Sequence, residues 1–158
     1  MSTVPQGGGG LSAVCHGIGD DGRFLLLHTG RGADVSPAFT LAGLAPEART
    51  LAVVLEDLSH PIPSFTHWIL WDLPAAPEIP GSVPPGRILP ALGGARQGLA
   101  YGPCRYAGPK PPKGRSHTYR FTICALDRAL GPGLGKRRFR RMAQGHILQT
   151  ATVEGVFG

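Results

Sequence analysis

Five segments of the chain carry apolar residues in short runs or in alternation with polar ones, the patterns that predict β-strands. They are residues 23–30, 51–57, 65–73, 117–127 and 150–157. The segment FTHWILWDL alternates most regularly and predicts one shared face for Phe65, His67, Ile69, Trp71 and Leu73. The run LAVVLED does not alternate and ends in carboxylates, which is typical of a strand buried on both faces.

One late segment predicts a helix instead. Residues 136–151 place Phe139, Ala143 and Ile147 at helical spacing. Stretches rich in proline and glycine separate the expected strands, and the stretch over residues 74–116 is long. Strands, long irregular loops and one late helix together predict a mainly β protein, an antiparallel β-sandwich. A loop of more than about 15 residues within a compact domain usually has a function.

The composition fits one folded domain with a short tail. The 158 residues include 24 glycines and 16 prolines, which punctuate the apolar runs and indicate turns. The stretch STVPQGGGG predicts a flexible tail over residues 1–10, followed by one domain over residues 11–158. The apolar runs are shorter than the roughly 18 residues of a membrane-spanning helix, so no integral membrane association is expected. Three cysteines without a CxxC pair favour a cytoplasmic location.

The positive charge is concentrated in one place. The net charge is +6, and the segment KRRFRR (residues 136–141) supplies five positive charges, so the rest of the chain is close to neutral. Such a run is most simply the solvated face of the predicted helix. It contains a single aromatic residue and belongs to none of the common nucleic-acid-binding motifs, so we do not expect a nucleic-acid partner.

Polar residues gather where the predicted strands begin or end. Asp57 closes one strand, His67 lies early in the next, and His117 and Tyr119 open a third. The loop YAGPKPPKG (residues 106–114) leads into this third strand. Imidazoles, a phenol and backbone N–H groups beside a glycine are donors suited to a small anion, and proline restricts the flexibility of the wall. Taken alone, His67 and Tyr119 would each more simply be core residues.

These residues together resemble the phosphatidylethanolamine-binding protein family, which includes the Raf kinase inhibitor proteins and their bacterial relatives. Family members have a D-P-D-x-P segment, then an H-W pair, and then G-x-x-G-P-x-P-P leading to G-x-H-R-Y-x-F-x-x-Y-A-L-D. This chain has DLSHP, HW, and YAGPKPPKG followed by HTYRFTICALD, in the same order. The segment from residue 36 to residue 57 and the closing stretch QGHILQTATVEGVFG are also similar.

The resemblance implies a β-sandwich that binds phosphate, a phosphoethanolamine-like headgroup or another small anion in one pocket. The family's pocket residues correspond to Asp57, His67, Gly108, Pro109, His117 and Tyr119. The histidines and Tyr119 would donate to the anion, and Asp57 would orient a histidine or accept from an ammonium group. Gly108 and Pro109 would shape the wall. Inhibition of a kinase or protease partner is a further implication, whereas no enzymatic activity, cofactor or metal is expected.

Three positions depart from the family pattern. Ser59 replaces the second acid of D-P-D-x-P, Lys110 stands where the loop often has a cysteine, and Thr118 replaces an arginine. The first two changes remove a negative charge and add a positive one. They favour phosphate or a carboxylate over the zwitterionic ethanolamine headgroup as a hypothesis for the ligand.

Three other functions stay open from the residues alone. A hydrolase could use Ser59 or Ser116 with a histidine, but the chain lacks a G-x-S-x-G elbow. A metal site could use His60 with the other pocket histidines, but without the spacing that marks strong metal sites. A scaffold with a vestigial pocket would bind a protein partner through its surface.

Overall fold

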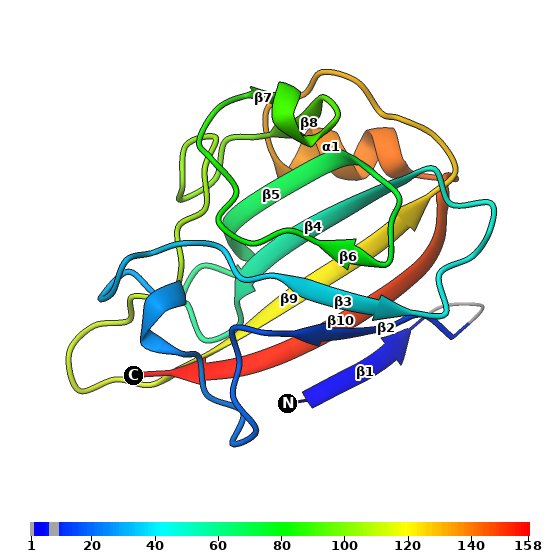
Figure 1. Cartoon of the computed structure of the whole chain (residues 1–158). Coiled ribbons are helices and arrows are strands. Elements are labelled where there is room, and N and C mark those ends of the chain that lie inside the picture. Colours follow the sequence, from blue (N-terminus) through cyan, green and yellow to red (C-terminus); the bar gives the residue numbers. More distant parts are fainter. Residues whose placement is uncertain (1, 7–9) are drawn as a thin grey trace.

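Two antiparallel sheets lie face to face, and a single helix covers the outer face of the larger sheet (Figure 1). The computed structural model describes residues 2–6 and 10–158. The larger sheet has the strand order β1-β10-β9-β4-β5-β8-β7, and the smaller has the order β2-β3-β6. The predicted mainly β fold with one late helix is therefore confirmed, and the sheets do not close into a barrel.

The larger sheet is built from β1 (Ser2–Gln6), β4 (Thr50–Asp57), β5 (Phe65–Pro74), β7 (Ile88–Leu89), β8 (Ala95–Gln97), β9 (His117–Leu126) and β10 (Ile147–Phe157). The smaller sheet is built from β2 (Ser12–Cys15), β3 (Phe39–Ala42) and β6 (Glu78–Ile79). The helices are the 3-10 turns η1 (Leu26–His28) and η2 (Pro90–Leu92) and the α-helix α1 (Lys136–Ala143).

Strand β4 lies at the centre of the fold and is buried on both faces, as its unbroken apolar run predicts. Leu51, Val53 and Leu55 face the smaller sheet and join the main core. Ala52 and Val54 face the other way, into a second cluster beneath α1. Because apolar residues are needed on both sides, the strand cannot alternate with polar ones.

Helix α1 rests on this second cluster through a narrow apolar stripe. Phe139 and Ala143 are buried against the sheet, whereas Arg137, Arg138 and the following pair of arginines are exposed. The basic run is thus the solvated face of a helix, as predicted. The helix is shorter than expected, because Gly145 adopts a φ of 82° and Ile147 already pairs with Leu126 in the sheet.

One prediction near the N-terminal end is wrong. The segment 23–30 is not a strand: backbone bonds from His28 to Leu25 and from Thr29 to Leu26 close a 3-10 turn instead. Strand β1 at Ser2–Gln6 lies within the stretch predicted as a tail, and it pairs with β10 along the edge of the larger sheet. Residues 1 and 7–9 lie outside the described part of the chain.

Strand β5 does not keep the single face that its alternation predicts. The register of β5 against β4 slips by one residue at His67 and again near Asp72, where φ is 58°. Each such bulge reverses which face the following side chains occupy. Ile69 and Trp71 therefore pack beneath α1, while Leu73 returns to the core between the sheets. The bulge at His67 leaves that side chain on the same side of the sheet as the core, at its open end.

The long loop before β9 is fixed to the sheet by one buried side chain. The Gln97 carbonyl accepts a hydrogen bond from the Trp68 indole at 2.7 Å, and its amide donates to the carbonyl oxygens of Pro84, Gly86 and Cys104. A buried amide must satisfy its hydrogen bonds, so this loop has one preferred path.

None of the described helices combines the length and the apolar character that crossing a bilayer requires.

Candidate functional site

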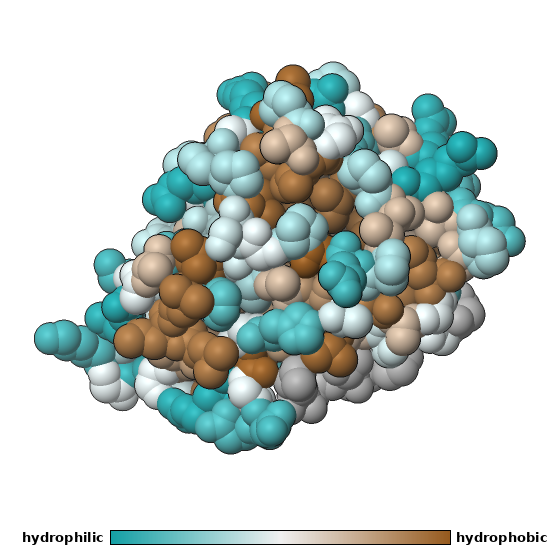
Figure 2. All heavy atoms as spheres, viewed as in Figure 1, coloured by the Kyte–Doolittle hydropathy of each residue, from teal (hydrophilic) through white to brown (hydrophobic). Residues whose placement is uncertain are grey.

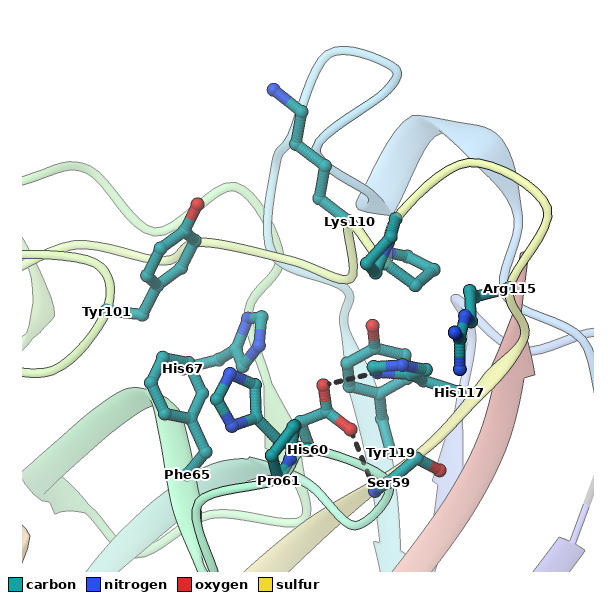
Figure 3. A pocket seen from close by; sticks show the side chains of 13 residues that line it. Ser59, His60, Pro61, Phe65, His67, Tyr101, Lys110, Arg115, His117 and Tyr119 are labelled. Atoms are coloured by element: carbon teal, nitrogen blue, oxygen red, sulfur yellow. Dashed lines mark hydrogen bonds and ion pairs between the residues drawn. The ribbon is translucent and has the colours of Figure 1, made fainter.

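A pocket of about 580 Å³ opens at one end of the larger sheet, where β4 ends and β5 and β9 begin (Figure 3). Three segments line it: the ends of these strands, the loop after β4, and the proline-rich loop before β9. The lining residues are Asp57, Ser59, His60, Pro61, Phe65, His67, Tyr101, Lys110, Pro111, Pro112, Arg115, His117 and Tyr119. Four of the six residues predicted for the site, Asp57, His67, His117 and Tyr119, are therefore brought together here.

Asp57 and His117 form a pair at the base of the pocket. The Asp57 Oδ2 atom lies 2.7 Å from His117 Nδ1, and its other oxygen accepts the backbone N–H of Ser59 at 2.9 Å. A carboxylate can only accept, so His117 carries a proton on Nδ1 and its Nε2 atom is left for a ligand. Asp57 thus orients His117, one of the two roles that the resemblance implies for it.

His67 is likewise held through Nδ1, but by a backbone carbonyl rather than a carboxylate. Its Nδ1 atom lies 2.9 Å from the Ala107 carbonyl oxygen, which can only accept, so the proton of the neutral ring sits on Nδ1. Burial lowers the pKa of His67, and the neighbouring Ala107 carbonyl and Asp57 charge only partly oppose this effect. His67 is therefore neutral at pH 7, and its Nε2 atom presents a lone pair.

Tyr119 contributes a donor that has no partner. Its side chain is 1% exposed, and its hydroxyl makes no hydrogen bond within the described part of the chain. Burial, followed by the charge of Asp57, raises its pKa. The Lys110 backbone N–H opposes this shift but does not reach hydrogen-bonding geometry. A protonated phenol without a partner at the edge of a pocket is what a bound oxygen atom would satisfy.

Gly108 and Pro109, the other two predicted residues, lie behind the pocket wall. The Gly108 N–H donates to Asp34 Oδ1 at 2.7 Å, and the Pro109 carbonyl accepts the N–H of Gly30 at 2.8 Å. These bonds fasten the loop to the segment that follows η1. The wall itself is made by Lys110, Pro111 and Pro112.

Ser59 closes the pocket on the side of the loop after β4. Its hydroxyl oxygen accepts the backbone N–H of Thr118 at 2.9 Å, so the loop is tied to the start of β9. The hydroxyl is not bonded to an imidazole. Ser59 therefore lacks the contact that would activate it as a nucleophile.

Three aromatic rings form a wall that the sequence did not reveal in full. His60 stacks on Phe65 with ring centroids 3.9 Å apart, and Tyr101 lies 5.1 Å from the His67 ring. The Ile62 N–H donates to His60 Nδ1, which places the proton of neutral His60 on Nε2. Phe65 shares the alternation of His67, but Tyr101 sits in an irregular loop without any periodic signal.

Two cationic side chains stand at the mouth of the pocket. Lys110 and Arg115 are exposed, and Figure 3 shows the Lys110 ammonium group pointing away from the imidazoles. The lysine stem packs against Gly30, where a Cβ atom would lie 2.9 Å from it. Both charges can attract an anion toward the mouth without a fixed contact. Among the described residues, no three His, Cys, Asp or Glu side chains are grouped as a metal site would need.

The sequence matches a protein-family model and is similar to several curated proteins. A family model described as phosphatidylethanolamine-binding protein matches residues 16–158. A UPF0098 protein of Pyrococcus abyssi is 31% identical over 161 aligned positions, which cover 99% of this chain and 90% of the relative. A UPF0098 protein of Methanothermobacter thermautotrophicus is 34% identical, and the alignment covers 93% of this chain and 98% of the relative.

Solved structures share the fold. A phosphatidylethanolamine-binding protein homologue from Chlamydia trachomatis has a TM-score of 0.76 and 26% identity, over 92% of this chain and 95% of that one. Escherichia coli YbcL, described as a member of the mammalian PEBP family, has a TM-score of 0.77 at 24% identity, over 92% and 96% of the two chains. The second likeness concerns the fold alone.

Proposed function

The chain belongs to the phosphatidylethanolamine-binding protein family, and from this premise we propose that its pocket binds a small anion or a phosphorylated headgroup. The observation that carries the proposal is the buried Tyr119 hydroxyl, which has no partner among the described residues and lies beside two imidazoles. Each imidazole is fixed through Nδ1, so both Nε2 atoms are left for one ligand. Such convergent groups suit the oxygens of a phosphate.

The protonation of these groups determines how an anion would bind. Tyr119 donates as it stands, whereas neutral His67 presents a lone pair and can donate only after taking up a proton. An arriving anion favours that proton, because opposite charges stabilise the charged imidazole. We therefore propose that anion binding is coupled to proton uptake at His67, whose positive charge the nearby Asp57 carboxylate would favour.

The proposal is tested by an NMR titration of backbone amides with phosphate and phosphoethanolamine. We expect saturable shifts around His67, Tyr119 and the loop before β9 in the parent. His117→Ala should weaken binding roughly tenfold or more, because a ring at the ligand site is lost and the buried Asp57 carboxylate is left unpaired beside the anion. Tyr119→Phe should weaken it by a similar factor while retaining the fold, because only an unpartnered hydroxyl is removed.

A matched control for this titration is His146→Ala, which removes a histidine that contacts Asp127 near the end of α1. It should leave the shifts unchanged. A well-dispersed parent spectrum with no shifts at millimolar ligand would contradict the proposal and favour a scaffold with a vestigial pocket. Shifts that survive His117→Ala would mean that the anion binds elsewhere.

The preference among anions is expected to depend on Ser59. A second carboxylate at this position would attract the ammonium group of phosphoethanolamine, so Ser59→Asp should raise the affinity for phosphoethanolamine relative to phosphate by about two- to fivefold. The measurement is the ratio of the two dissociation constants. Ser116→Asp adds the same charge outside the pocket lining and should leave the ratio closer to the parent's. An unchanged ratio in Ser59→Asp would refute the role of Ser59.

We also propose that the pocket binds rather than catalyses. The Ser59 hydroxyl accepts a backbone N–H and is not bonded to an imidazole, which argues against a serine hydrolase.

A cytoplasmic location is supported by the three cysteines, Cys15, Cys104 and Cys124, which are all free. A kinase or protease partner is a further prediction from the family resemblance, and it concerns surfaces outside the pocket.

A further inference from the structure

Three consecutive leucines project from the molecule at η1. The side chains of Leu25, Leu26 and Leu27 are 48%, 58% and 51% exposed. Figure 2 shows an apolar patch over this turn, which stands out from the largely polar surface around it. Contiguous exposed apolar side chains are uncommon on a protein surface and usually mark an interaction site.

The leucines are held outward by the structure beneath them. The backbone of Leu25 donates to Gly17, and the carbonyl of Leu27 accepts from Val35. The Thr29 hydroxyl caps the turn by donating to the Leu26 carbonyl at 2.9 Å. Because the turn is fixed at these points and Phe24 already occupies the core beside it, the leucines have no interior position available.

Basic residues surround this leucine turn (Leu25, Leu26 and Leu27). Arg23 precedes it and Arg31 follows it, and both line a shallow depression with Lys113 and Arg115 of the proline-rich loop. The Arg31 guanidinium donates to the Pro111 carbonyl at 2.7 Å, which joins the loop to the leucine turn. Asp20 and Asp21 are exposed acidic side chains in the turn just before Arg23, and the Arg23 guanidinium donates to the Gly158 backbone oxygen in the same depression. Positive side chains therefore outnumber negative ones around the leucines.

We propose that the leucine turn and its basic surround form a docking surface for an anionic lipid bilayer. Leucine side chains would enter the boundary between headgroups and acyl chains, while arginine and lysine contact lipid phosphates. A second copy of the chain is a poorer occupant, because a symmetric contact would bring two positively charged surfaces together. Charge complementarity thus favours an anionic partner over self-association.

The docking surface adjoins the pocket and shares part of its rim. Pro111, Pro112 and Arg115 line both the basic depression and the pocket. A bilayer seated on the leucine turn would therefore place lipid headgroups close to the mouth of the pocket. The docking surface does not rest on ligand binding, since none of the leucines lines the pocket.

The test is co-sedimentation of the full chain with vesicles of phosphatidylcholine, with and without phosphatidylglycerol. We expect binding to the anionic vesicles that weakens as salt is raised. Replacing all three leucines by serine should lower the partition coefficient by roughly tenfold to a hundredfold, because about half of each side chain is available for burial. The substitution Arg31→Glu, which reverses one positive charge of the surround, should also weaken binding to the anionic vesicles.

Matched variants separate the alternatives. Ile88→Ser removes an apolar side chain that is 53% exposed on β7, at a distance from η1 (Figure 1), and should bind as the parent does. His117→Ala should also bind vesicles normally, so failure of the pocket and failure of the docking surface are distinguishable. Circular dichroism and thermal melts should show a folded triple variant, because the three changed positions are exposed.

Three outcomes would overturn the inference. The parent could fail to sediment with anionic vesicles at low salt. Binding could survive the triple leucine change but disappear in Arg140→Ser, Arg141→Ser, which would assign it to the basic face of α1. Finally, the parent could form a dimer in solution that the leucine change dissociates, which would identify a second copy as the occupant.

Discussion

Replacing Gly108 by alanine is expected to lower the free energy of unfolding by roughly 3 kcal/mol, although only one methyl group is added. A Cβ atom at this position would overlap the backbone carbonyl oxygen of His28 and lie 2.9 Å from both Asp34 Oδ1 and the Tyr106 hydroxyl. Neither neighbour can move freely, because Asp34 accepts the Gly108 N–H and Tyr106 donates to the His28 carbonyl. The glycine is needed for space.

Chemical denaturation of the parent and of Gly108→Ala measures this loss in the free energy of unfolding. Gly114→Ala is the matched control in the same loop, since nothing lies within 4 Å of the added atom. The Gly114→Ala variant should be destabilised only by the strain of alanine at a positive φ, which costs about 1 kcal/mol. Equal stabilities for the two variants would mean that the loop is not fastened at Gly108. In that case the pocket wall would be far more mobile than the hydrogen bonds indicate.

The affinity of the pocket for sulfate is expected to rise steeply as the pH falls. Sulfate stays a dianion across this range, so any pH dependence belongs to the protein. Burial lowers the pKa of His67 in the empty pocket, and a bound dianion would raise it again. Between the pKa of His67 in the empty pocket and its higher pKa in the complex, the affinity for sulfate should rise by up to about tenfold for each unit by which the pH falls. From about pH 8 to about pH 5 the affinity could thus increase by about a hundredfold.

Calorimetry in buffers with different ionisation enthalpies counts the protons directly. Uptake of a proton on binding is expected for the parent near neutral pH, and less uptake for His67→Gln. His146→Gln makes the same replacement outside the pocket and should bind sulfate as the parent does. Sulfate affinity that does not change with pH would contradict the mechanism and leave Tyr119 and His60 as the donors.

The opposite dependence is expected for the stability of the empty protein. Below the ordinary histidine pKa of about 6.5 the unfolded chain binds a proton at His67, whereas the folded chain, with its lowered pKa, does not. Stability is therefore lost as the pH falls from about 6.5 toward the lower pKa of the folded state. Sulfate should offset this loss because it binds the protonated pocket.

Several site residues could be predicted because their signal is local. Alternation at the start of β9 places His117 and Tyr119 on one face, and the predicted ends of the neighbouring strands place Asp57 and His67 near them. Tyr101 and Arg115 gave no such signal, because they lie in loops whose paths depend on distant partners. Tyr101 reaches His67 only because backbone bonds tie its loop to the edge of β5.

The sequence by itself determined the fold class, the double burial of β4, the amphipathic α1 and four of the residues that line the pocket. Each follows from stereochemistry within a few residues, since side chains of a strand alternate and those of a helix recur. Only the tertiary structure decided the faces of β5, the turn at residues 23–30 and the place of Gly108 behind the wall. Bulges, turns and close backbone approaches are set by what the chain meets across space, and one extra residue in a strand reverses every face that follows.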